Sequence, residues 1–180
     1  MDAHGDHALQ CAKDVGPKFR HNVVRDTVAD MTGRVGIQVR KEVPVGLIND
    51  KGIELKPADV MFFGWGGGKD LCVDLIGVSP FAGDGLNRFQ AGNAVIAAER
   101  RKISKYQEAC TKGGFGFAPF SFSTFGELGP GALDIMDRIC RHTSAHFGTK
   151  STTYLYQRLG FSVQKGVGAQ LMARLPTNYM

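Results

Sequence analysis

The sequence predicts a mixed α/β domain with a β-sheet of about four strands flanked by helices, and three observations lead to this class. The length of 180 residues, 43% of them apolar and 22% charged, suits one domain with a sizeable core. Segments with apolar residues at helical spacing alternate with short apolar runs of strand length. A glycine-rich stretch at 64–68 separates two of these runs, as a hairpin turn does.

The first half of the chain is expected to form one helix and three strands. Apolar residues recur at helical spacing from His21 to Thr32, and Gly33 marks the end of this helix. The runs on either side of the glycine-rich turn are rich in strand-forming residues. The three strands are expected at 35–45, 56–63 and 71–78.

The second half is expected to add a helix, an aromatic strand and further helices. Pro130 in the first turn and Gly148 just past the last turn delimit one of these helices. The expected order is a loop at 79–93, a helix at 94–111, a strand at 115–125, the helix from 130 to 147, and one or two short helices within 152–175. The inward stripes of the two longer helices are expected to be Ile96, Ile103, Tyr106 and Cys110, and Leu133, Met136, Ile139, Cys140 and Phe147.

Two aspartates, Asp59 and Asp74, lie inside the apolar runs that flank the turn. A carboxylate removed from water needs a cation or several hydrogen-bond donors. If the turn is centred between Gly66 and Gly67, the two aspartates stand opposite each other with Cβ atoms roughly 4.5 to 5.5 Å apart. This spacing predicts a shared Mg²⁺ or Mn²⁺ ion, which takes oxygen ligands. Two exposed, solvated aspartates are the alternative.

Basic residues are concentrated near the C-terminal end of a chain whose net charge is +5. The 43 residues from Arg138 onward contain no Asp or Glu. Contact with nucleic-acid phosphates, with Arg158 and Lys165 as candidates, is one hypothesis, and a solvated helical face is the other.

Four cysteines lack the spacing of a disulfide framework, which predicts a reduced intracellular protein with free thiols in the core. No segment has the length and composition of a membrane-spanning helix, and no charged-then-apolar leader precedes the first helix. We therefore expect no membrane partner. We also expect the chain to be a module of a larger protein, with its start imposed at Met1.

Several short motifs carry a family resemblance. Pro57-Ala58-Asp59 is followed after 14 or so residues by Asp74, and then by a predicted helix with the sequence Lys-Ile-Ser-Lys-Tyr at 102–106. The first predicted helix carries Arg-His-Asn-Val-Val-Arg-Asp at 20–26. With this order of elements, the chain resembles the C-terminal restriction-like endonuclease domain of site-specific non-LTR retrotransposons. The resemblance implies a restriction-endonuclease-like core over 16–180 and a Mg²⁺- or Mn²⁺-dependent DNA endonuclease.

The resemblance also has departures. An alanine separates Pro57 from the first acid, and Ile76 stands where many nucleases of this fold have a lysine. The family implies a migrated lysine from the facing helix as the replacement, either Lys102 or Lys105, and the sequence does not choose between them. The reverse transcriptase of the resembled elements is missing, so a fused or associated polymerase is an expected partner.

The first helix presents two polar ridges opposite its apolar stripe. His21 and Arg25 form one ridge, and Asn22 and Asp26 form the other. We expect Asp26 to complete the metal site, and His21, Asn22 and Arg25 to contact DNA. Capping and surface ion pairs are the alternative for these residues.

Further DNA contacts are expected from residues beside the turn and on the helix of the two lysines: Trp65, Lys69, Arg101 and Tyr106. Trp65 is expected either to stack on a base or to anchor the turn on the core. Tyr106 is expected either at the DNA or packed in the core.

Residues 1–15 look like a remnant of the zinc knuckle that precedes the nuclease in the resembled elements. His7 and Cys11 have the spacing of half a Cys-Cys-His-Cys site, which implies zinc binding only in a longer protein, because two ligands do not close a structural zinc site.

Three functions remain open from the sequence. The first is a DNA endonuclease of a retroelement or a gene derived from one, located in the nucleus. The second is a nuclease fold that binds nucleic acid without cleaving it. The third is an interaction domain with incidental aspartates. A homodimer is compatible with each of them.

Overall fold

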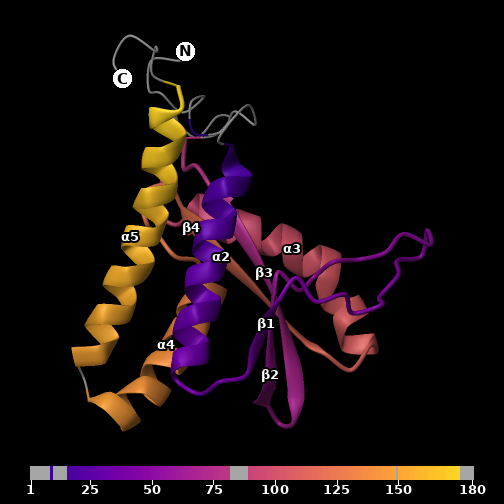
Figure 1. Cartoon of the computed structure of the whole chain (residues 1–180). Coiled ribbons are helices and arrows are strands. Elements are labelled where there is room, and N and C mark those ends of the chain that lie inside the picture. Colours follow the sequence, from indigo (N-terminus) through magenta and orange to yellow (C-terminus); the bar gives the residue numbers. More distant parts are fainter. Residues whose placement is uncertain (1–8, 10–15, 82–88, 149, 175–180) are drawn as a thin grey trace.

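The computed structural model describes residues 9, 16–81, 89–148 and 150–174, which form a four-stranded sheet flanked by helices (Figure 1). The predicted α/β class is confirmed. The strands are β1 (Val39–Lys41), β2 (Val60–Gly66), β3 (Lys69–Val78) and β4 (Gly116–Ser123). The helices are α2 (Pro17–Arg34), α3 (Asn93–Lys112), α4 (Pro130–Phe147) and α5 (Lys150–Met172).

The sheet is mixed, with the order β1-β2-β3-β4. The first three strands form an antiparallel meander, whereas β4 runs parallel to β3 from the pair Leu71 and Gly116 to the pair Val78 and Ser123. Parallel neighbours need a crossover connection, and α3 lies within it. Strand β3 is therefore central, and its residues from Leu71 to Leu75 are all buried.

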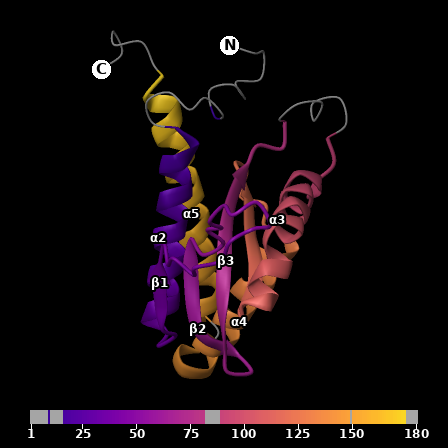
Figure 2. The same ribbon diagram turned by 90° about the vertical axis from the view of Figure 1, so that its right-hand side faces the viewer.

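Helices cover both faces of the sheet, α2 and α5 on one side and α3 on the other (Figure 2). Successive residues of β3 alternate between the two cores, because side chains of a strand point to opposite faces. Val73 packs in the core built with α2, α4 and α5, and Cys72 packs in the core built with α3. All described cysteines (Cys72, Cys110 and Cys140) are buried free thiols, as predicted.

Strands β2 and β3 pair in a hairpin as predicted, but the turn lies one residue later than expected and a bulge compensates for the difference. Gly67 and Gly68 form the turn with positive φ angles of 58° and 75°, which glycine adopts without strain, and Gly66 pairs with Lys69. A bulge between Phe62 and Gly66 then shifts the register. Beyond the bulge, Val60 pairs with Val73, which is the register expected from the sequence.

Several predicted boundaries were wrong. Strand β1 covers only 39–41 of the predicted 35–45, and β2 begins at Val60 instead of residue 56. Residues 43–59 instead form an arm with one isolated bridge between Ile48 and Glu54. The short helices expected near the end are one 23-residue helix, α5, which packs along α2 and α4. Ile103 and Leu133 are exposed instead of inward, and the side chain of Phe147 lies outside the described part.

The buried carboxylate of Glu99 connects three elements. It accepts a hydrogen bond of 2.9 Å from the Ser121 hydroxyl of β4 and bonds of 3.1 Å from the Gly131 amide in the first turn of α4. An acidic group at a helix N-terminus satisfies free amides and complements the helix dipole. Glu99 of α3 thus fixes the start of α4 against the sheet.

No helix among the described residues is both long enough and apolar enough to span a membrane.

We predict opposite effects for two glycine-to-alanine substitutions in α5. A Cβ at Gly166 would lie 2.7 to 2.9 Å from the Cγ, Cβ and Cα atoms of Arg20, whereas a Cβ at Gly160 would meet nothing within 4 Å. Gly166→Ala should lower the free energy of unfolding by about 1–3 kcal/mol, because α5 must move away from α2. Gly160→Ala should raise it by about 0.5–1 kcal/mol through helix propensity. Urea denaturation measures both, and equal effects would contradict the close approach of the helices.

Candidate catalytic site

The two aspartates singled out by the sequence lie side by side in the hairpin region, Asp74 within β3 and Asp59 one residue before β2. Asp59 directly precedes β2, and because Val60 pairs with Val73, Asp59 stands opposite Asp74 of β3. The register expected from the sequence is thus present up to the neighbouring pair of Val60 and Val73, and Asp59 itself lies just outside its strand. The charge of Asp59 acts on the pKa of Asp74, so the two groups form one electrostatic unit.

The Asp59 carboxylate bonds to the edge of β3 and to the first helix. Its Oδ2 atom accepts a hydrogen bond of 2.7 Å from the Leu75 amide and faces His21 Nε2 at 3.1 Å. The side chain therefore takes the place of a backbone partner at the edge of β3, where the pairing with β2 ends. Burial would raise the pKa of Asp59, but the hydrogen bond and charge of His21 and the Leu75 amide outweigh it, so the pKa is lowered overall.

The Asp74 carboxyl group is almost fully buried, with 3% exposure of the residue. Lys102 Nζ of α3 lies 3.0 Å from Oδ1 and 2.8 Å from Oδ2. Oδ2 accepts no hydrogen bond of good geometry among the described residues. Burial raises the pKa of Asp74 to about 6, because the opposing effect of Lys102 is smaller and the charge of Asp59 adds to the rise.

The structure distinguishes the two candidate lysines by their contacts. Lys102 forms the ion pair with Asp74, whereas Lys105 lies with its Nζ 4.7 Å from the ring centre of Tyr106 and is exposed. The hydrogen bond with Tyr106 raises the pKa of Lys105. Lys102, which comes from the helix facing β3, is thus the cation at the buried carboxyl group.

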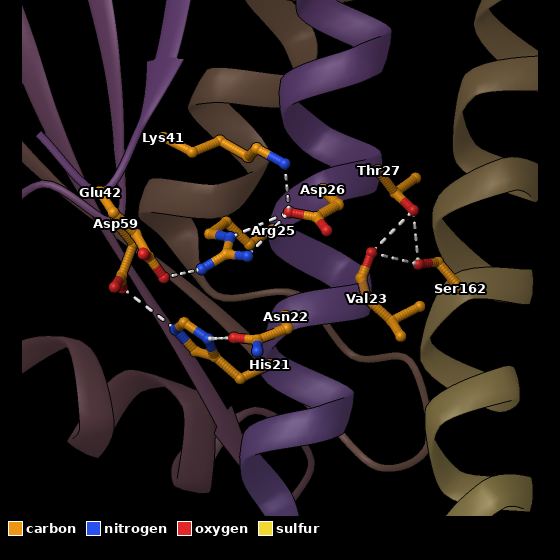
Figure 3. Close-up of polar contacts among 10 residues, drawn as sticks. All are labelled: His21, Asn22, Val23, Arg25, Asp26, Thr27, Lys41, Glu42, Asp59 and Ser162. Atoms are coloured by element: carbon orange, nitrogen blue, oxygen red, sulfur yellow. Dashed lines mark hydrogen bonds and ion pairs between the residues drawn. The ribbon is translucent and has the colours of Figure 1, made fainter.

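The first helix contributes His21 to this site, whereas Asp26, expected among the metal ligands, is not brought to Asp59 and Asp74. His21 points toward Asp59, while Asp26 points toward Arg25 and Lys41 (Figure 3). Arg25 and Lys41 nitrogens lie 2.9 and 3.0 Å from Asp26 Oδ1. The carboxylate of Asp26 is therefore neutralised by cations of its own, on the ridge of α2 that also carries Asn22.

Both ring nitrogens of His21 face oxygen atoms. Nε2 faces Asp59, and Nδ1 lies 3.2 Å from Asn22 Oδ1. An imidazolium donates from both nitrogens, so this environment favours the charged form. Burial would lower the pKa of His21, but the hydrogen bond and charge of Asp59 and the bond with Asn22 raise it overall. Asn22 thus orients the histidine.

Arg25 joins α2 to the segment that carries Asp59. Its buried guanidinium forms ion pairs with Asp26 and with Glu42 (Figure 3). Glu42 has a φ angle of 51°, an unusual left-handed conformation for a residue other than glycine. Its amide donates a hydrogen bond of 2.9 Å to the Asp59 carbonyl. Arg25 and Glu42 therefore hold the backbone at Asp59, and both are engaged within the protein.

The predicted metal set reduces to Asp59 and Asp74. Among the described residues, no group of three or more His, Cys, Asp or Glu side chains gathers as a metal site. The two carboxyl groups nevertheless fit a divalent cation. Asp74 Oδ2 is buried without a well-formed hydrogen bond, and the like charge of Asp59 opposes ionisation of Asp74, which a cation would relieve. Mg²⁺ binds through one or two carboxylates and keeps several waters.

Two aromatic residues expected at the DNA are in the core. Trp65 is buried, with its ring centre 4.8 Å from that of Phe62 and the Arg138 guanidinium 4.3 Å above it. Tyr106 is buried against Phe117 at 5.6 Å. Both follow the alternative in which the ring anchors the fold. The bulge in β2 turns Trp65 inward, which its sequence position beside a tight turn did not indicate.

The predicted basic contacts lie on different parts of the molecule. Arg101 is exposed one position before Lys102, and Lys69 is exposed beside the hairpin turn. Arg158 of α5 forms an ion pair with Asp30 of α2, and Lys165 is exposed on α5. Of these four residues, only Arg101 is next to Lys102 in the sequence. Arg158 and Lys165 lie on α5, which packs on α2 and α4.

His7 and Cys11, the predicted zinc ligands, lie outside the described residues, as does nearly all of the segment 1–15. Arg20 was not predicted as a site residue. It is 2% exposed and donates a 2.6 Å hydrogen bond to Gln170 Oε1. Its position directly before His21 was the feature of the sequence that could have indicated a place near the site.

A comparison with protein-family models finds no matching family, and a comparison with curated proteins finds no significant match.

We predict that Asp59→Asn lowers the pKa of His21 below the ordinary histidine value. The substitution removes the charge that favours imidazolium and leaves the burial that opposes it. The stability contributed by the pair is present below the ordinary histidine pKa and is lost as the pH rises through the raised one. NMR titration of the His21 ring in EDTA measures the shift.

Asp134→Asn, at an exposed position of α4, is the control and should leave the His21 titration unchanged. An unchanged His21 pKa in Asp59→Asn would contradict the contact.

Proposed function

We propose that this protein is a metal-dependent endonuclease that hydrolyses DNA phosphodiester bonds. One observation carries the proposal: Asp59, one residue before β2, and Asp74 of β3 directly follow the ladder pair of Val60 and Val73, and the ammonium group of Lys102 lies 2.8 Å from the buried Asp74. Two acids and a lysine in one electrostatic unit are the residues that this chemistry requires.

The acids would hold Mg²⁺ or Mn²⁺, which supplies a water of lowered pKa and polarises the phosphate when bound. Lys102 provides a fixed cation where negative charge develops on the phosphoryl oxygens, and such preorganised charges act most strongly away from water. His21 and the Leu75 amide keep Asp59 ionised and oriented. Asn22 orients His21, and the Arg25–Glu42 pair holds the backbone at Asp59.

The resemblance of the motifs supports the same proposal. The meander, the crossover helix with its lysine and the parallel fourth strand are in the order expected for a restriction-endonuclease-like core. Lys102 supplies, from α3, the lysine that many restriction-like nucleases carry two residues after the second acid, where this chain has Ile76. DNA, a retroelement reverse transcriptase as partner and a nuclear location belong to this proposal.

A second candidate function is nucleic-acid binding without cleavage. It is favoured by the absence of a third metal ligand among the described residues and by the engagement of Lys102 with Asp74.

We predict that Asp74→Asn and Asp59→Asn abolish nicking of supercoiled plasmid in Mg²⁺ or Mn²⁺. Lys102→Met should reduce the rate by about 10²–10³-fold, as removal of one charge-stabilising group does. Lys105→Met is the matched control on the same helix and should stay within about threefold of wild type, because Lys105 does not contact Asp74. Gel densitometry gives the rates, and melting curves confirm folding.

Plasmid that stays intact with the wild-type protein in both metals would refute the nuclease. Salt-sensitive DNA binding under the same conditions would then support the second candidate. Equal losses in Lys102→Met and Lys105→Met would refute the role given to Lys102.

A further inference from the structure

A cavity of 570 Å³ lies beside the candidate catalytic site. Arg20 of α2, Ile76 of β3 and Arg101 of α3 line it. Each of these residues is one or two positions from His21, Asp74 or Lys102, and they come from the same three elements. The cavity therefore lies along the last residues of β3, one or two positions from the catalytic residues and beyond the point where β2 ceases to pair with β3.

The charge of this cavity suits a polyanion. Its described lining contains two arginines and no acidic residue. A second cavity of 460 Å³, between α3 and the arm at 46–55, differs because Asp50 and Glu108 line it together with its lysines. Of these two cavities, the first thus combines a position next to the elements of the catalytic site with charged lining residues that are all basic.

An aromatic wall borders the first cavity. Phe89 lines it and is 48% exposed. The ring of Phe81 supports Phe89 at a centre-to-centre distance of 5.6 Å, and Phe125 packs edge-on against Phe81 at 5.2 Å. A half-exposed ring held by a second ring is a platform on which a nucleobase stacks, because every base has a π face.

Two amide side chains stand next to this wall. Asn93 Nδ2 donates a hydrogen bond of 2.7 Å to Gln90 Oε1, and both residues line the cavity. This bond uses the acceptor of Gln90 and one donor of Asn93. The complementary atoms, Gln90 Nε2 and Asn93 Oδ1, have no partner among the described residues. A donor and an acceptor side by side match the polar edge of a base.

We propose that this cavity binds one unpaired nucleobase of the DNA strand that the catalytic site cleaves. The proposal rests on the proposed function, because it makes DNA the ligand. The volume of the cavity is in the range of sites that bind small molecules. The base stacks on Phe89 and bonds to Gln90 and Asn93, and Arg101 contacts the adjacent phosphate. A base that stays stacked in a duplex cannot enter, so the cavity selects DNA with an unpaired nucleotide at the cut.

The test compares three fluorescent DNA probes with the full chain in EDTA, where no cleavage occurs. One probe is fully paired, one has a single unpaired thymidine, and one has an abasic residue at that position. The abasic probe keeps the phosphates and the backbone bend but lacks the base. Wild-type protein should bind the thymidine probe at least about tenfold more tightly than the abasic probe, as one stacked base accounts for.

A pair of matched variants locates the effect. Ala97 is exposed and lines the cavity, so Ala97→Phe fills the cavity and should reduce the tenfold ratio to about one. Ala145→Phe makes the same change at an exposed position of α4 outside the cavity and should keep the wild-type ratio. Melting curves verify both variants, and the comparison of probes on wild-type protein needs no variant.

Each outcome decides between the hypotheses. Equal wild-type affinity for the thymidine and abasic probes would overturn the proposal, since the cavity would then recognise phosphate alone or no DNA. A ratio kept by Ala97→Phe would place the base elsewhere. Plasmid nicking without base preference would refute the cavity and leave the nuclease. Base preference without nicking in Mg²⁺ or Mn²⁺ would refute the nuclease and leave the cavity.

Discussion

The buried carboxyl group of Asp74 is the constraint on which the arrangement around it depends. A carboxylate inside the sheet is costly unless a cation or donors surround it, and burial raises the pKa of Asp74 to about 6. Lys102 supplies the cation from α3. Because β4 continues the sheet in parallel, the chain must cross over after β3, and this crossover places α3 over Asp74. The topology thus brings the lysine to the acid.

The other half of the site is built on the opposite helical layer. Asp59 ends the pairing of β2 with β3 by bonding to the Leu75 amide, and His21 of α2 holds the same oxygen. The electrostatic coupling between Asp59 and Asp74 therefore links α2 to α3 across the central strand. Packing on both faces, through two separate cores, keeps these groups in fixed positions.

The candidate site and the cavity lie where the sheet is incomplete. Strand β2 pairs with β3 only as far as Val73, so the last residues of β3 have no strand beside them on that side. Asp59 occupies the first of these positions, and the cavity lined by Ile76 lies next to it. A polar site and a basic cavity can thus adjoin each other along one strand, where a longer β2 would have covered both.

Part of the site could be predicted from local sequence signals. The glycines at 66–68 predicted a turn, and the expected register is present at Val60 and Val73, next to Asp59 and Asp74, because a bulge offsets a turn that lies one residue later than expected. The helix boundaries followed from Pro130, Gly33 and Gly148 within a few residues. The choice between Lys102 and Lys105 could not be made, because both lie on one helix and its rotation relative to β3 depends on the packing of Tyr106 and Cys110.

The sequence by itself determined the α/β class, the hairpin beside the two aspartates and the approximate ends of the helices, because turn residues, strand periodicity and helix ends are local properties. Tertiary structure decided which polar residue of α2 meets Asp59. His21 does so, while Asp26 is taken by Arg25 and Lys41. It also turned Trp65 into the core. These outcomes depend on the docking angle of a helix and on a bulge, and both are set by contacts between residues distant in the chain.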